Sequence, residues 1–244
     1  MMMKKHTWLL TIALSGCDSE PATQALPPRE ECALAVVNSD YSSTAVSLLT
    51  ADGHLCAPDI ITSGSRPPTL LTALSGDVVI PFEPAPNGQL HLIDRFPNGV
   101  ITTLDPLTGD VTSQTRASVG FAGNPQDIAF TPSPLVSRLR RSEADDLGSD
   151  LVALATGETI DLSNYVDSRT QPMPTRFARA KGLLWIGLTN LSADFSVAGE
   201  GRVIGLDPTT LEVKRVLQVP WLQNCGNIAS VSYTHLTLPT SDLV

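Results

Sequence analysis

The sequence predicts an all-β fold, and three observations lead to that prediction. The 244 residues include 17 glycines and 19 prolines, which favours a chain with many turns. No stretch sustains the periodicity of an amphipathic helix, and the apolar segments are short. A unit of β-like segments separated by turns recurs along the chain. We therefore expect many short strands arranged as repeats.

Four tight turns set the phase of this repeat. Each turn follows a β-like segment, and these segments are residues 44–50, 100–105, 151–154 and 203–207. Gly53, Gly109, Gly157 and Leu211 occupy equivalent places in the turns, at intervals of 56, 48 and 54 residues. An earlier strand opens each unit, at residues 34–38, 90–94, 135–139 and 183–188.

The intervals are close to the ~40–50 residues of a four-stranded propeller blade with loop insertions. The fold class that the sequence predicts is therefore all-β, a partial β-propeller of about four blades. Aromatic residues make up only 5% of the chain, which leaves a β-sandwich or an irregular β-solenoid as alternatives.

One unit carries a family pattern. Residues 100–111, then Val119-Gly120, then residues 124–130 resemble the YVTN-type repeat of surface-layer and periplasmic β-propellers, and residues 201–216 are similar. The resemblance spans about residues 33–230 and is strong in two units and loose in two. It implies one blade per unit in a ring commonly closed by seven blades, so we expect further blades encoded beyond Ser230.

The N-terminus has the pattern of an export signal. Lys4 and Lys5 precede an apolar run at residues 8–14 that is too short to span a bilayer. The run ends in Leu14-Ser15-Gly16-Cys17, which resembles the bacterial lipobox. That resemblance implies removal of residues 1–16 and a lipid on Cys17. An ordinary signal peptide with a coincidental cysteine is the alternative.

These features predict where the protein works. Residues 17–31 would form a lipidated cysteine and a flexible tether, because they contain three prolines and no periodic apolar face. The expected location is the bacterial cell envelope, anchored to a membrane by the N-terminal lipid and facing the periplasm or the cell surface. The formal net charge is -9, so nucleic acid is not an expected partner. The expected partners are the membrane and, beyond it, envelope proteins.

The cysteines fit an oxidising compartment. Cys32 and Cys56 are expected to form a disulfide, closing a loop of about 25 residues worth roughly 3 kcal/mol. Two buried thiols are the alternative. Cys225 is then unpaired, and we expect its partner beyond Ser230.

The last residues have a different character. Residues 231–240 read VSYTHLTLPT, which resembles the conceptual translation of an adapter used in DNA sequencing libraries. We therefore expect residues 231–244 to be a non-native tail and residues 32–230 to hold the truncated propeller blades. A genuine β-strand with alternating Thr and Leu is the alternative.

The sequence predicts no catalytic residue, no metal site and no cofactor. His54 and His91 make no ligand pair, and the chain has neither a nucleophile elbow nor a glycine-rich phosphate loop. The densest charge cluster contains Arg138, Arg140, Arg141, Glu143, Asp145, Asp146 and Asp150. It is a candidate site for a cation or a partner, although such clusters are usually solvated loops with mutual ion pairs.

The sequence favours a binding or scaffold module over an enzyme. A propeller enzyme of the lactonase or quinoprotein-dehydrogenase kind, with its site partly in missing blades, is the alternative.

Overall fold

The computed structural model describes residues 26–140 and 150–231, and this part of the chain is all-β. Its only helical turns are two short 3₁₀ segments, Arg29–Glu31 and Ser163–Tyr165. No helix in the described ranges is long and apolar enough to span a bilayer.

The strands form four antiparallel sheets in sequence order. Sheet I contains β1 (Cys32–Ser39), β2 (Thr44–Thr50) and β3 (Leu55–Thr62). Sheet II contains β4 (Val78–Val79), β5 (Leu90–Asp94), β6 (Val100–Leu104) and β7 (Val111–Arg116). Sheet III contains β8 (Pro125–Ala129), β9 (Leu135–Arg138), β10 (Leu151–Ala153) and β11 (Thr159–Ile160). Sheet IV contains β12 (Pro174–Ala180), β13 (Leu183–Leu188), β14 (Gly201–Leu206) and β15 (Val213–Val219).

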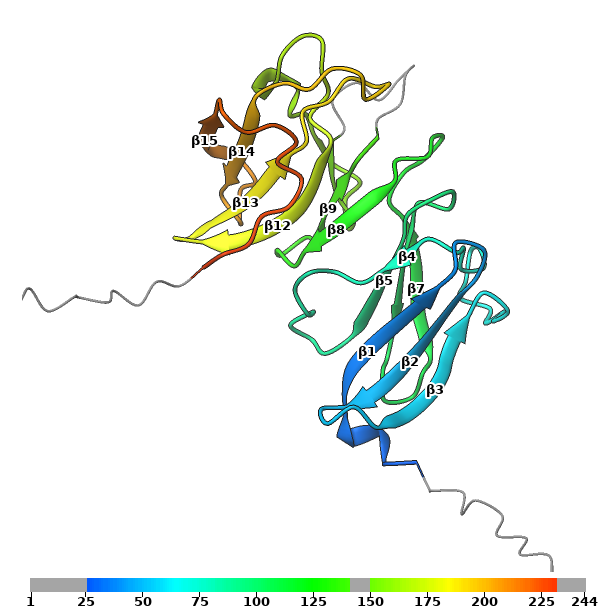
Figure 1. Cartoon of the computed structure of the whole chain (residues 1–244). Helices are drawn as coiled ribbons and strands as arrows, with labels where there is room; N and C mark the ends of the chain where they lie inside the picture. Colours follow the sequence, from blue (N-terminus) through cyan, green and yellow to red (C-terminus); the bar gives the residue numbers. More distant parts are fainter. Residues whose placement is uncertain (1–25, 141–149, 232–244) are drawn as a thin grey trace, which may run out of the picture.

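The sheets follow one another in an arc, with sheet I and sheet IV at opposite ends (Figure 1). Within each sheet every strand pairs with its neighbour in sequence, so each sheet is a simple meander. The structure contains no closed ring of sheets in the described residues. The all-β prediction and the repeated sheets are confirmed.

The predicted strands coincide closely with the observed ones. The expected segments at residues 44–50, 90–94 and 183–188 are β2, β5 and β13, and the other five differ by one or two residues at one or both ends. The turn between the last two strands of each unit also repeats. Gly53, Gly109, Gly157 and Leu211 all have positive φ, at 89°, 79°, 73° and 59° respectively.

Leu211 stands where the other three turns have glycine, and its contacts show how the turn is stabilised. A leucine in the left-handed region is strained, since its Cβ approaches the following carbonyl. Its N–H nevertheless donates to the Asp207 carbonyl at 2.9 Å, as that of Gly109 does to Asp105 at 2.8 Å. The Leu211 side chain packs against the buried cluster between sheets III and IV, so packing offsets the strain.

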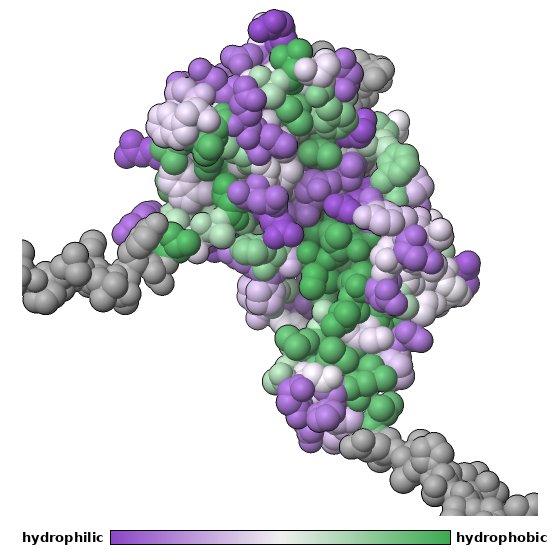
Figure 2. Space-filling view, viewed as in Figure 1, coloured by the Kyte–Doolittle hydropathy of each residue, from purple (hydrophilic) through white to green (hydrophobic). Residues whose placement is uncertain are grey.

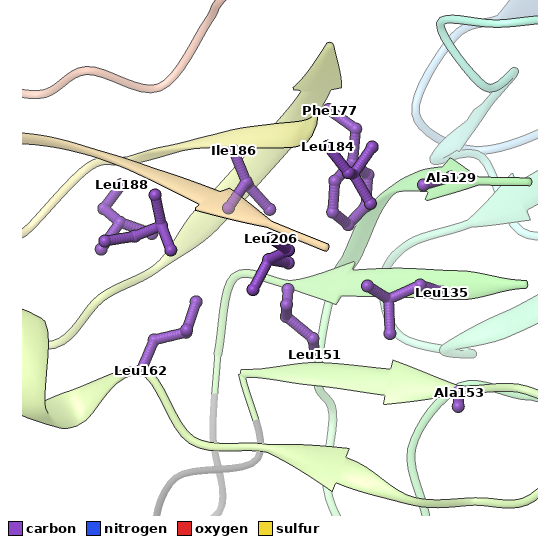
Figure 3. Close-up of a cluster of buried hydrophobic side chains, with 11 residues drawn as sticks. Ala129, Leu135, Leu151, Ala153, Leu162, Phe177, Leu184, Ile186, Leu188 and Leu206 are labelled. Atoms are coloured by element: carbon purple, nitrogen blue, oxygen red, sulfur yellow. The ribbon is translucent and has the colours of Figure 1, made fainter. Parts of the chain in front are cut away.

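Three apolar clusters fill the three spaces between consecutive sheets. Leu92 and Leu104 of sheet II pack toward sheet I, whereas Ile93 and Ile101 of the same strands pack toward sheet III. This alternation buries both faces of a central sheet. The largest cluster joins sheets III and IV and includes Leu135, Leu151, Phe177, Leu184, Ile186, Leu188 and Leu206 (Figure 3).

Sheet I lacks one strand of the unit. Its strands β1, β2 and β3 correspond to β5, β6 and β7, because the positive-φ turns at Gly53 and Gly109 join equivalent strands. Nothing in sheet I corresponds to β4, β8 or β12, the first strands of the other sheets. The outer edge of β1 therefore has no strand beside it within the described residues, and Leu34 and Val36 on it are 50% and 44% exposed.

The predicted disulfide is present. Cys32 at the start of β1 is bonded to Cys56 in β3, with Cα atoms 6.0 Å apart. The bond spans the sheet across β2 and fixes the two outer strands of sheet I relative to each other.

Candidate ligand-binding site

A polar cavity lies where the first strands of sheets II, III and IV converge. Its volume is about 310 Å³. Val79 of β4, Gln126 and Asp127 of β8, and Thr175 and Arg176 of β12 contribute to its wall. Three separate sheets thus build one site, which is the usual way in which a rigid scaffold positions polar side chains.

The segment after β15 completes the wall. Asn224 and Asn227 of this segment line the cavity. Cys225 of this segment packs against two glycines of sheet IV. A Cβ atom on Gly187 would lie 2.1 Å from the carbonyl oxygen of Cys225, and a Cβ atom on Gly201 would lie 2.6 Å from the Sγ atom of Cys225. Only glycine at these places allows the backbone to approach so closely.

Asp127 holds the three sheets together at this cavity. Its Oδ1 accepts hydrogen bonds from the backbone N–H groups of Phe82 and Ile128, both at 2.9 Å. Its Oδ2 accepts one from the N–H of Phe177, also at 2.9 Å. Phe82 follows β4 and Phe177 lies in β12, so one carboxylate in β8 bonds to segments of sheets II and IV.

The environment of Asp127 has opposing effects on its pKa. Burial raises the pKa above its ordinary value, since a charged carboxylate loses its hydration. The three N–H donors and the nearby Arg176 guanidinium oppose that rise. Asp127 is 2% exposed, so its hydrogen bonds replace nearly all of its contact with water.

The two arginines of the cavity differ in their partners. Arg95 donates from Nε to Asp77 Oδ1 at 2.9 Å and is ion-paired with it. Arg176 has no carboxylate within 4 Å in the described parts of the chain, and its guanidinium lies 5.2 Å from the ring centroid of Phe82. The stacking holds the exposed cation in place by a cation–π contact.

One hydroxyl in the wall has no hydrogen-bond partner. The Oγ1 atom of Thr175 is buried and contacts no donor or acceptor among the described residues. By contrast, Thr189 Oγ1 donates to the Met173 carbonyl at 3.0 Å. Buried polar atoms are nearly always paired in native proteins, so the unpaired Thr175 hydroxyl is an exception in the cavity wall.

The residues predicted from the sequence lie elsewhere. Cys17 and the lipobox residues Leu14, Ser15 and Gly16 fall outside the described residues. His54 is exposed in the turn between β2 and β3, whereas His91 is half-buried in β5 against Phe130. Among the described residues no three His, Cys, Asp or Glu side chains gather as metal ligands. Cys225 is a free thiol in the structure.

The charge cluster of sheet III needs a correction. Arg138 and Asp150 are 3% and 2% exposed, so the expectation of a wholly solvated loop is wrong for these two residues. The guanidinium of Arg138 lies over the Phe121 ring, and Asp150 accepts a hydrogen bond from the Leu162 N–H at 2.7 Å. Both side chains therefore belong to the packing of sheet III. Residues 141–149 lie outside the described residues.

No protein-family model matches the chain, and no curated protein is significantly similar to it in sequence.

The cavity offers hydrogen-bond donors and acceptors together with one unpaired cation. Its amides, hydroxyls and guanidinium groups are binding groups, and the Asp127 carboxylate in its wall already accepts three backbone N–H groups. Such a set is suited to holding a polar ligand in one orientation.

The role of Asp127 gives a prediction about pH. The pKa of Asp127 is higher in the folded state than the unfolded value of 3.8, so folding favours the protonated carboxyl. The resulting stabilisation is fully present below pH 3.8 and is lost as the pH rises through the folded pKa. Asp127→Asn removes this dependence. It also lowers the free energy of unfolding by about 1–3 kcal/mol, because the new NH₂ group faces a backbone N–H. Urea unfolding between pH 4 and pH 8 measures both effects.

Asp207→Asn is the matched control. Asp207 is partly exposed in a turn, and two backbone N–H groups lower its pKa, so above about pH 5.5 it is ionised in both the folded and the unfolded state. Its replacement should therefore leave the slope of stability against pH unchanged above that pH. If Asp127→Asn has the same slope of stability against pH as the wild type, Asp127 is not the source of that slope. The source would then be Asp94, because its buried carboxyl also has a raised pKa.

Proposed function

We propose that this chain is a lipid-anchored, extracytoplasmic β-propeller of the bacterial envelope that acts as a binding module. In this proposal the four sheets are four blades, and further blades complete the ring. The cavity at the first strands of sheets II, III and IV is its binding site. That cavity is the observation that carries the proposal, since three repeats converge there to present polar groups on fixed backbone.

The repeat supports the propeller. Consecutive sheets pack face to face, and their first strands β4, β8 and β12 lie on the same side of the arc. The outer edge of β1 has no strand beside it in the described residues. Ring closure leaves only short protected edges, whereas an open uncharged edge favours association with other strands.

The disulfide supports an oxidising compartment. Bonds such as Cys32–Cys56 persist in the periplasm and outside the cell and are rare in the cytosol. This fits export by the N-terminal signal. The lipobox at Leu14-Ser15-Gly16-Cys17 adds the anchor, because two or more acyl chains hold a protein stably on a membrane.

The anchor is tested by labelling. The full chain, expressed in a bacterium grown with an alkyne analogue of palmitate, should acquire the label and sediment with membranes. Cys17→Ser should lose both properties, whereas Cys225→Ser should keep both because its thiol lies in the folded part. Label retained in Cys17→Ser would contradict the lipoprotein assignment.

The binding site is tested by thermal shift. A small-molecule fraction extracted from bacterial envelopes should raise the unfolding temperature of the wild type, since a ligand at 100 times its Kd adds about 2.7 kcal/mol of stability. Thr175→Phe should abolish the rise by filling the cavity. Thr175→Val, which keeps the shape, should retain a rise. Equal shifts in wild type and Thr175→Phe would place binding elsewhere, and no shift in any protein would contradict the binding function.

A further inference from the structure

A second cavity, which we call the apolar groove, lies beside β1. Its volume is about 410 Å³, within the range of small-molecule sites. Leu34 of β1 and Leu48 of β2 form one wall, and Ile80, Phe82 and Phe130 form the other. Figure 2 shows the apolar surface that runs over β1 and the connection between β4 and β5, with hydrophilic side chains next to it.

The apolar groove and the polar cavity adjoin. Ile80 lines both of them. Arg176 lines the polar cavity, and its guanidinium stacks on Phe82, which lines the apolar groove. A positive charge thus lies where the polar and the apolar surfaces meet.

The other charged groups of the apolar groove are neutralised. Glu83 is paired with Arg179, whose Nε lies 3.1 Å from Glu83 Oε2. The Arg179 guanidinium also donates to the Phe130 carbonyl at 2.8 Å. Burial lowers the pKa of His91, so its imidazole is neutral at pH 7.

Arg176 is the arginine of the polar cavity that has no ion-pair partner within 4 Å among the described residues. Arg95 is paired with Asp77, and the Asp127 carboxylate accepts three backbone N–H groups. Arg176 has only the stacked ring of Phe82 and the more distant Asp127 carboxylate. Its guanidinium retains free N–H donors in the fork geometry that matches a carboxylate.

We propose that the two cavities bind one amphiphilic carboxylate, with its head on Arg176 and its hydrocarbon chain in the apolar groove. This inference rests on the proposed binding function and names the ligand class. The charge of Arg176 selects an anionic head, and the exposed side chains of Leu34, Ile80 and Phe82, at 50%, 42% and 47%, gain burial from the chain. The proposed ligand is a free, monomeric carboxylate of medium chain length.

The test is isothermal titration of the full chain carrying Cys17→Ser, which cannot be acylated and so needs no detergent. The probes are butanoate, octanoate and dodecanoate, each below its micellar concentration, with dodecanol as the uncharged analogue. Affinity should rise about fourfold for each methylene that enters the apolar groove. Dodecanol should bind more weakly than dodecanoate.

Two variants with matched controls separate the head from the chain. Arg176→Gln should weaken dodecanoate by about 10- to 100-fold and leave dodecanol unchanged, because only the carboxylate bonds to the guanidinium. Arg215→Gln, an exposed arginine of β15, should change neither. Leu34→Asn should reduce the gain per methylene, whereas Val36→Asn, exposed on the same strand but outside the groove, should not.

Three outcomes would overturn the inference. Equal affinities for dodecanol and dodecanoate, unaffected by Arg176→Gln, would mean that the groove takes neutral ligands. Binding of gluconate as tightly as dodecanoate would confine the ligand to the polar cavity. Binding to phosphatidylglycerol vesicles but to no monomeric carboxylate would make the surface a membrane contact. In each case the proposed binding function is judged separately, by the thermal shift with the envelope fraction. A shift that Thr175→Phe abolishes would still support that function. If no shift occurs, both the proposed function and the carboxylate inference are contradicted.

Discussion

The arrangement of the sheets around the cavity depends on one buried carboxylate. Asp127 belongs to β8, yet its two oxygens accept N–H groups from the segment after β4 and from β12. A residue in the middle sheet thus fixes the positions of the sheets on either side. Asp127 and its neighbour Gln126 both line the polar cavity, so the residue that holds the three sheets together also belongs to the wall of the site.

The packing between sheets explains why a polar joint is needed there. Apolar clusters fill the spaces between consecutive sheets, and burial of this kind is not directional. Hydrogen bonds to a buried carboxylate are directional, and leaving them unmade would be costly. Asp94 has a similar role within sheet II, where it accepts from the Ser75 N–H at 2.8 Å and from the Asn98 amide at 2.9 Å. Buried acids thus set the geometry and apolar clusters supply the driving force.

The sequence predicted the sheets well and the site poorly, for physical reasons. Strands and turns are local, so the β-like segments and the glycines at positions 53, 109 and 157 that follow three of them were sufficient to place the strands. Even Leu211 was placed correctly by its position in the repeat. The role of Asp127 depends on residues about 45 and 50 positions away, and no local signal in the segment 124–130 distinguishes it from an exposed acid. Arg176 likewise gains its meaning only from Phe82, far from it in sequence.

Amide hydrogen exchange in Asp127→Ala tests the central constraint most directly. The amides of Phe82 and Phe177 lie in segments of different sheets and share only the Asp127 carboxylate. The account predicts that both lose protection together in the variant. The amide of Ala153, which donates to the Glu158 carbonyl at 2.9 Å within sheet III, should keep its protection. Unchanged protection at Phe82 and Phe177 would contradict the account, because some other contact would then hold the three sheets in place.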